Sequence, residues 1–240
     1  MSKKKQARTK LLVSVTGAVE AITAMENGAD LIDIKDPSRG SLGAASPDVW
    51  REVLGVVNKQ VPVSAALGEI RNIDLEKLAT ETRGLSFAKV GMSDATTNGV
   101  FDWRYYWRQW RSLLKRGTQP VLVVYADWRD CGAPSPAELV QCVPEFRVPV
   151  VLVDTYDKSN GNLREHCSDA QLIRFIGAVR DAKAQVVLAG SLQLSDLPDL
   201  LPLAPDYVAV RGAVCRGART GRLDGALVRE WATALSTSRK

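Results

Sequence analysis

The sequence predicts a single (β/α)8 TIM barrel, an α/β fold, and three observations support this. Short apolar runs alternate with helix-forming segments eight times along the 240 residues. The runs are rich in Val, Ile, Leu and Ala without polar alternation, which is typical of strands buried on both faces of a parallel sheet. No linker or low-complexity stretch divides the chain, and its length suits one barrel. A doubly wound open sheet is the alternative, but no G-x-G-x-x-G follows the first run.

The elements follow in order along the chain. Strands are expected at residues 11–15, 31–35, 61–66, 87–91, 120–126, 149–154, 185–189 and 206–211. Helices are expected between and after them, at residues 17–27, 48–58, 74–82, 101–115, 136–143, 169–184, 194–201 and 225–236. Gly28 is suited to end the first helix. Ser46 and Pro47 are suited to begin the second, as N-cap and first helical residue.

One helix admits a second interpretation, because aromatic and basic residues are concentrated in it. Between residues 101 and 115, an aromatic and apolar stripe lies beside a basic stripe. The first stripe consists of Trp103, Tyr106, Trp107, Trp110 and Leu114. The basic stripe consists of Arg104, Arg108, Arg111 and Lys115. We favour a barrel helix that docks its aromatic face and exposes its arginines. Base stacking in a nucleic-acid-binding protein is the alternative.

Composition limits the class of protein and its partners. With 45% hydrophobic and 25% charged residues, the chain is globular. Its net charge of +5 favours anionic partners, although residues 1–10 contribute several of the positive charges and are expected to form a flexible tail. No apolar run could span a bilayer or serve as a secretory signal. Four unpaired cysteines predict reduced thiols and a cytoplasmic protein. His166 is the only histidine, so a His-based zinc site is excluded, and no metal is expected.

Charged residues at the ends of three predicted strands are the candidate catalytic groups. Asp33 and Lys35 end the second strand, Lys89 lies in the fourth, and Asp154 ends the sixth, with Lys158 just beyond. Functional residues of a barrel lie at the carboxyl ends of its strands, and alternate strands contribute to one layer, so these groups are expected at similar height. A structural ion-pair network, such as Lys35 with Asp33 or Lys89 with Asp154, is the alternative.

Clustered lysines have a specific chemical use. Burial and neighbouring cations both disfavour the ammonium form. A neutral amine attacks an aldehyde or ketone to form an imine, and the protonated imine favours removal of a proton from the adjacent carbon. An aspartate can orient the amine or relay protons. These residues therefore predict imine chemistry on a carbonyl substrate.

Glycine-containing loops after three strands are the candidate phosphate sites. The loop after the second strand contains Ser38, Arg39, Gly40 and Ser41. Gly190 and Ser191 follow the seventh strand, and Arg211 and Gly212 end and follow the eighth. The loops after strands seven and eight often bind phosphate in this fold.

Together these motifs resemble those of the (5-formylfuran-3-yl)methyl phosphate synthase family, also called 4-(hydroxymethyl)-2-furancarboxaldehyde-phosphate synthases. The resemblance runs in order from about Leu11 to the C-terminus through Asp33-Ile-Lys35-Asp-Pro-Ser-Arg-Gly-Ser-Leu-Gly43, Lys89-Val-Gly91, Tyr125-Ala-Asp127, Asp154-Thr-x-x-Lys158, Leu188-Ala-Gly-Ser191, Val210-Arg-Gly-Ala213 and Gly221-Arg-x-Asp224.

The resemblance implies a TIM-barrel lyase of methanofuran-type cofactor biosynthesis. It implies that two molecules of glyceraldehyde 3-phosphate, a phosphorylated triose, condense with loss of phosphate and water, without metal or organic cofactor. Lys35 matches the Schiff-base lysine and Lys89 the proton acceptor, while Asp33, Asp154 and Lys158 match supporting groups. The alternatives are a Schiff-base aldolase or isomerase acting on another phosphorylated sugar, or the nucleic-acid-binding protein. We also expect a homo-oligomer, no membrane partner and no nucleic acid.

Overall fold

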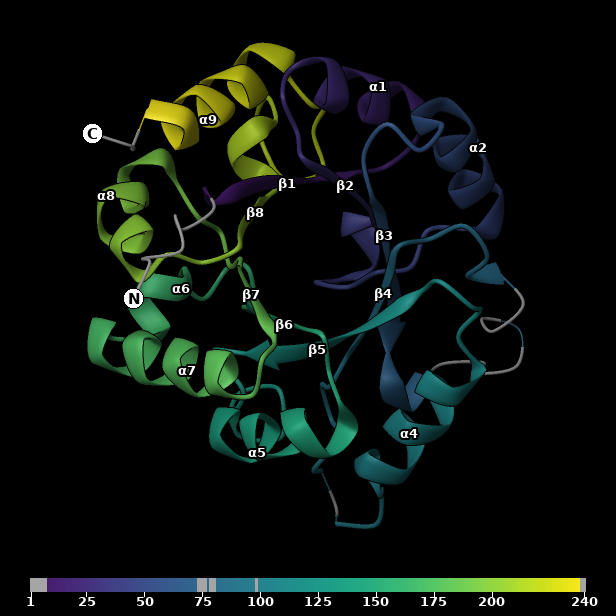
Figure 1. The fold of residues 1–240 in the computed structure, drawn as a ribbon, viewed down its shortest axis with the longest axis vertical. Coiled ribbons are helices and arrows are strands. Elements are labelled where there is room, and N and C mark those ends of the chain that lie inside the picture. The colour runs from purple at the N-terminus through teal and green to yellow at the C-terminus, as the bar shows by residue number, and fades with distance from the viewer. Residues whose placement is uncertain (1–7, 73–76, 78–80, 98, 238–240) are drawn as a thin grey trace, which may run out of the picture.

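The fold is a closed parallel barrel, as predicted. The computed structural model describes residues 8–72, 77, 81–97 and 99–237. Within these ranges eight strands each pair in parallel with the next, and β8 returns to β1 (Figure 1). The strands are β1 (Lys10–Val15), β2 (Leu31–Ile34), β3 (Val63–Glu69), β4 (Phe87–Gly91), β5 (Gln119–Tyr125), β6 (Val150–Asp154), β7 (Gln185–Leu188) and β8 (Tyr207–Val210).

Helices surround the barrel on its outside (Figure 1). They are α1 (Ala18–Glu26), α2 (Pro47–Val57), α4 (Trp103–Leu113), α5 (Pro136–Phe146), α6 (Leu163–His166), α7 (Asp169–Asp181), α8 (Leu197–Leu200) and α9 (Gly225–Thr237). The predicted helix at residues 74–82 lies mostly outside the described residues. The short helix α6 was not predicted. The predicted helix at residues 194–201 is divided into a 3-10 turn, the four-residue α8 and the start of a second 3-10 turn, because Pro198 and Pro202 lack the N–H that a continuous α-helix needs.

The first strand begins within the predicted N-terminal tail. Lys10 is part of β1, and Nη1 of Arg8 lies 2.8 Å from a carboxylate oxygen of Asp30. The hydroxyl of Thr9 donates to the carbonyl of Pro205 at 2.8 Å. Residues 8–10 therefore belong to the barrel, which corrects the predicted boundary, whereas residues 1–7 lie outside the described residues.

The aromatic helix α4 packs against the rest of the barrel as predicted. Trp103, Trp107 and Trp110 are buried. Phe146, at the end of α5, stacks on Trp107 with ring centroids 4.8 Å apart. This packing accounts for the continuation of α5 past Pro144, beyond its predicted end at Val143. Arg104 and Arg108 form ion pairs with acidic residues of α5, so the aromatic and basic stripes both have partners within the fold.

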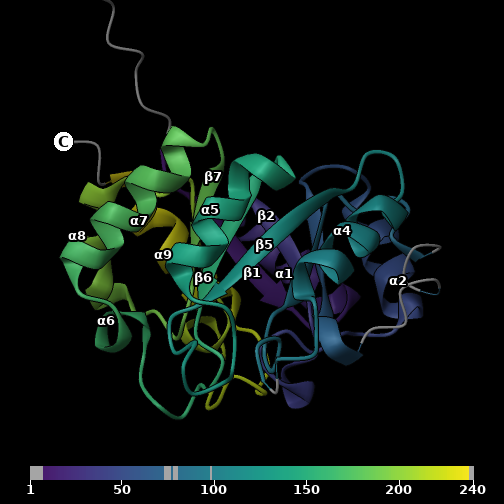
Figure 2. The same cartoon turned by 90° about the horizontal axis from the view of Figure 1, so that it is seen from below.

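The loops that follow the strands gather at one end of the barrel, the lower end in Figure 2. A parallel barrel requires this arrangement, since every strand ends on the same side. Apolar side chains of all eight strands, such as Val13, Ile34 and Leu122, are buried between barrel and helices or inside the barrel. Among the described helices, none is long and apolar enough to cross a membrane.

Candidate active site

The deepest charged groups of the site are Asp33 and Lys89, which form a buried ion pair. Nζ of Lys89 lies 2.6 Å from a carboxylate oxygen of Asp33, and both side chains are almost completely buried. The hydroxyls of Ser14 and Ser64 donate to the same carboxylate, Ser14 at 2.9 Å. The ion pair between Asp33 of β2 and Lys89 of β4 was not predicted; it forms across β3, which contributes only the small Ser64 beside Asp33.

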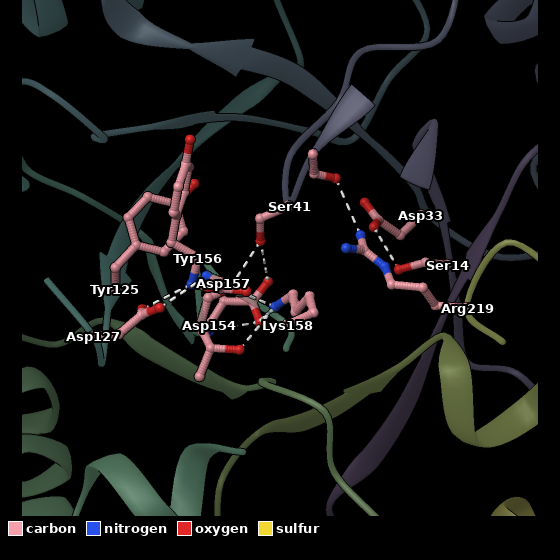
Figure 3. Close-up of polar contacts among 12 residues, drawn as sticks. Ser14, Asp33, Ser41, Tyr125, Asp127, Asp154, Tyr156, Asp157, Lys158 and Arg219 are labelled. Carbon is pink, nitrogen blue, oxygen red and sulfur yellow. Dashed lines mark hydrogen bonds and ion pairs between the residues drawn. The ribbon is translucent and has the colours of Figure 1, made fainter. Parts of the chain in front are cut away.

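A second cluster lies nearer the barrel mouth, around Asp154 at the end of β6. Lys158 pairs with the Asp154 carboxylate and also donates to the carbonyl of Thr155. The backbone N–H of Thr155 donates to the same carboxylate at 2.8 Å, and the Ser41 hydroxyl lies 3.3 Å from it (Figure 3). Burial alone would raise the pKa of Asp154, but the charges of Lys158 and Lys35 outweigh it and lower the pKa.

Lys35 differs from the other two lysines because no acceptor contacts its amine among the described residues. Its backbone N–H donates to Val15 at 3.0 Å, which holds the end of β2 against β1. The side chain is buried, and this burial is the main cause that lowers its pKa from 10.5 to about 7. Lys158 and Lys89 add to this effect, whereas Asp154 and Asp33 oppose it. A large share of Lys35 is therefore neutral near pH 7.

One cavity of about 390 Å³ connects these groups with the loops after β7 and β8. The predicted site residues that line it are Lys35, Lys89, Asp154, Lys158, Gly190, Ser191, Arg211 and Gly212. Asp33 lies beneath Lys89 and does not line the cavity. The charged groups thus occupy two levels, with the Asp33–Lys89 pair below Lys35 and Asp154, rather than the single layer that we expected from alternate strands.

Residues of the loops after β7 and β8 line the cavity, and several of their backbone N–H groups have no acceptor in the described structure. Gly190 and Ser191 both have positive φ, at 102° and 54°. A side chain at Gly190 would also crowd Leu163 and Thr155. In the described structure, the N–H groups of Gly190, Ser191 and Gly212 donate to no protein acceptor. Consecutive free N–H groups of this kind suit an anion.

Arg211 has a different role from the predicted phosphate contact. Its guanidinium makes five hydrogen bonds, as many as it has N–H donors: two to the Glu20 carboxylate and one each to the carbonyls of Ser14, Arg219 and Gly221. Glu20 belongs to α1, and its side chain is partly buried. The arginine therefore ties the loop after β8 to β1 and α1, and no donor remains for a ligand.

The loop after β2 is also arranged differently from the prediction. Ser38 and Arg39 are exposed and bond within the loop, Ser38 to Asp36 and Arg39 to the carbonyl of Ala44. Neither lines the cavity. Ser41 is buried and its hydroxyl contacts Asp154, so it supports the cluster around that carboxylate. Gly40 does not line the cavity either, but its carbonyl accepts a hydrogen bond from Arg219, which does, at 3.1 Å.

Several contributors were not predicted as site residues. Asp127, after β5, accepts the backbone N–H groups of Tyr156 and Asp157 at 2.7 and 2.8 Å and so holds the loop that presents Lys158 (Figure 3). Nη2 of Arg219, which lines the cavity, reaches across to Gly40. The sequence signal for Asp127 was its position just after a strand; Arg219 lies in a Gly- and Arg-rich loop that offered no way to choose among its arginines.

Gly91 provides space for one further buried carboxyl. A β-bulge between Ala66 and Glu69 turns the end of β3, and a side chain at Gly91 would occupy the position of the Glu69 carboxylate. The Tyr125 hydroxyl donates to this carboxylate at 2.7 Å, and burial raises the Glu69 pKa. The motif Lys89-Val-Gly91 therefore ends in glycine for a structural reason, because a side chain at position 91 would clash with Glu69.

Fold and site together define a TIM-barrel enzyme with a cationic cavity that contains one lysine without a partner. Comparison with known proteins gives the particular family. A sequence model of the family described as 4-HFC-P synthase matches residues 11–232. The chain belongs to this family, which is a family of enzymes.

Similar proteins agree with this assignment. The (5-formylfuran-3-yl)methyl phosphate synthase of Methanopyrus kandleri is 35% identical, over 95% of this chain and 100% of that protein. That of Methanosarcina barkeri is 34% identical, over 91% and 96%. A putative (5-formylfuran-3-yl)methyl phosphate synthase of Methylorubrum extorquens is 33% identical, over 95% and 92%.

Solved structures support the fold alone. Thiamine phosphate pyrophosphorylase from Pyrococcus furiosus superposes with a TM-score of 0.64 at 12% identity, covering 96% of this chain and 97% of that one. Phosphoribosylanthranilate isomerase from Thermotoga maritima superposes with a TM-score of 0.60 at 16% identity, covering 95% and 98%.

Proposed function

We propose that this protein is a (5-formylfuran-3-yl)methyl phosphate synthase that condenses two molecules of glyceraldehyde 3-phosphate through an imine on Lys35, as a carbon-oxygen lyase of methanofuran-type cofactor biosynthesis. Two triose phosphates contain the atoms of one furan aldehyde phosphate, one phosphate and two waters. The observation that carries the proposal is the buried, unpartnered amine of Lys35 in a cavity lined by free backbone N–H groups. Membership in the family supports the choice of substrate.

The first step uses the neutral form of Lys35. Its Nζ lone pair attacks the aldehyde carbon of one triose phosphate, and the carbonyl oxygen becomes a hydroxyl. Loss of that hydroxyl as water requires a proton donor. Lys89 is suited to this role because it lines the cavity and its amine forms an ion pair with Asp33 at 2.6 Å. Proton donation leaves Lys89 neutral and the imine protonated.

The next step uses Lys89 as the proton acceptor that the resemblance implies. The protonated imine acidifies the C–H bond of the adjacent carbon, and neutral Lys89 removes that proton to give an enamine. The substrate phosphate is on the following carbon. The nitrogen lone pair of the enamine then restores the C=N bond of the protonated imine, the enamine C=C electrons form a double bond to the carbon that carries the phosphate, and the phosphate leaves with the electrons of the broken C–O bond. Asp33 stabilises the ammonium form that Lys89 regains, and Ser14 and Ser64 orient Asp33.

The remaining groups bind and orient. Asp154 holds Lys158 beside the Lys35 amine, so the ammonium of Lys158 keeps the Lys35 pKa low and attracts anionic substrate. We place one phosphate at the free N–H groups of Gly190, Ser191 and Gly212. Backbone donors in this arrangement bind phosphate oxygens without requiring a charged side chain.

The test is incubation of the pure protein with glyceraldehyde 3-phosphate, followed by detection of a furan chromophore and free phosphate. Borohydride added during turnover should reduce the imine and attach the triose to Lys35, which peptide mapping locates. Lys35→Arg should abolish both signals, because a guanidinium stays charged. A trapped adduct on Lys35 without furan would indicate an aldolase or isomerase for another sugar, and an adduct on Lys158 would contradict the assignment of Lys35. A homo-oligomer and a cytoplasmic location stay predictions.

A further inference from the structure

Arg219 is an arginine of the cavity with most of its N–H donors unused in the described structure. It lies in the loop after β8, lines the cavity and is about half-buried. Of its five N–H donors, only one makes a hydrogen bond in the described structure, to the carbonyl of Gly40 at 3.1 Å. Figure 3 shows its guanidinium directed toward the loop that carries Ser41. Four donors of a fixed cation are therefore available to a ligand in the cavity.

The surroundings of this guanidinium favour an anion. Burial lowers the pKa of Arg219, and Arg211 adds to this effect while Asp154 opposes it. An arginine remains charged despite such a change. Asp154, the carboxylate that opposes the change, is already paired with Lys158. The guanidinium is thus partly desolvated and lacks an ion pair of its own, and a planar fork of donors matches two oxygens of a phosphate.

Arg211 explains why Arg219 stays in this position. Nε of Arg211 donates to the carbonyl of Arg219 at 2.9 Å, and Nη2 donates to the carbonyl of Gly221 at 2.9 Å. The Arg219 backbone packs on Gly212, where an added Cβ would lie 3.6 Å from the Cβ of Arg219. A buried ion pair with Glu20 anchors Arg211 in turn. Arg211 therefore holds the backbone of this loop in place, and Arg219 of the same loop lines the cavity.

We propose that Arg219 binds a substrate phosphate at the cavity mouth, separately from the N–H groups after β7 and β8, and that Arg211 is a positioning residue for it. A condensation of two phosphorylated trioses requires two anion sites, and here the inference rests on the proposed function. The second site lies where the loops after β2 and β8 meet, through Arg219 above Gly40, and Arg39 takes no part in it.

The test measures binding of inorganic phosphate by calorimetry at constant ionic strength, and it requires no turnover. Arg219→Gln should weaken phosphate binding roughly 10- to 100-fold, the effect of losing a charged hydrogen-bonding partner. Arg219→Lys should recover part of the loss. The matched control is Arg222→Gln, which removes an exposed arginine of the same loop and should change the affinity less than about two-fold.

The positioning role of Arg211 is tested by coupling. Arg211→Lys keeps a cation beside Glu20 but loses the bonds to the loop carbonyls, so it should weaken phosphate binding in the wild-type background. The same change should have no further effect in Arg219→Gln, because residues that act through one another are not additive. Melting temperatures verify that each variant is folded.

Two results would overturn the inference. One is phosphate affinity in folded Arg219→Gln within two-fold of wild type. The other is an equal loss of phosphate affinity when Arg211→Lys is introduced into the wild-type protein and into Arg219→Gln. Failure of the protein to form a furan from glyceraldehyde 3-phosphate would refute the proposed function and leave these binding results unchanged.

Discussion

The low proton affinity of Lys35 predicts how imine formation depends on pH. With a pKa of about 7, roughly half of the amine is neutral at pH 7, whereas an ordinary lysine at 10.5 would be neutral in about one molecule in three thousand. The gain in reactive amine is therefore roughly a thousand-fold. The rate of imine formation should rise with pH through a midpoint near 7 and become constant above about pH 8.

Lys158→Met is the perturbation that tests the cause. Its ammonium disfavours a second charge on Lys35, and its removal also leaves the Asp154 carboxylate free to attract that charge. Both effects raise the pKa of Lys35. The charge of a neighbouring side chain shifts a pKa by roughly one to two units. The midpoint of the pH profile, which reports the pKa of Lys35, should therefore move upward by that amount. At pH 7 the variant should form the imine roughly 5- to 50-fold more slowly.

The assay is the initial rate of borohydride trapping with glyceraldehyde 3-phosphate between pH 5.5 and 9. The matched control is Lys115→Met, which removes a lysine that follows α4 at the opposite end of the barrel and should leave the midpoint unchanged. A wild-type midpoint near 10 would refute the argument from burial. A midpoint in Lys158→Met that stays the same or falls would refute the argument from neighbouring charge.

Two further variants test the buried groups. Lys89→Met should slow trapping at Lys35 in single-turnover experiments and abolish furan formation, because Lys89 supplies the proton for the loss of water and then removes the C–H proton. Asp33→Asn in the same chain removes the buried negative charge that has lost its cation, and normal furan formation in that folded double variant would exclude Lys89 from the mechanism. Gly91→Ala should lower the free energy of unfolding by about 1–3 kcal/mol in denaturant titrations, since its methyl group must displace the Glu69 carboxylate. The control Gly55→Ala, whose methyl group meets no atom within 4 Å, should be neutral or stabilising. Equal effects of the two substitutions would contradict the clash at Gly91.

The sequence by itself determined the barrel and the end of it where the candidate site lies. Strands buried on both faces need apolar residues throughout, and that pattern is visible without tertiary information. Lys35 and Asp154 were identifiable because charged residues at the ends of apolar runs are rare in a core. The rule that parallel strands end together then brought them to one place, and the cavity confirms this for both residues.

Only the tertiary structure decided which charges pair. Asp33 and Lys35 are neighbours along β2, yet Asp33 pairs with Lys89 across β3, because the small Ser64 leaves space at that level. No pattern along the chain encodes a contact across a barrel. The low pKa of Lys35 follows from the same cause, since it depends on burial and on charges contributed by other strands.

The two arginines after β8, Arg211 and Arg219, also show a difference between what the sequence predicts and what the tertiary structure decides. Arg211 ends an apolar run and was therefore predicted to face a phosphate. In the folded protein, Glu20 of α1 and the loop carbonyls use all its donors, and Arg219 faces the cavity instead. The sequence contains both arginines, but their partners come from segments far apart in the chain. Long-range packing thus decides which guanidinium is structural and which is available to a ligand.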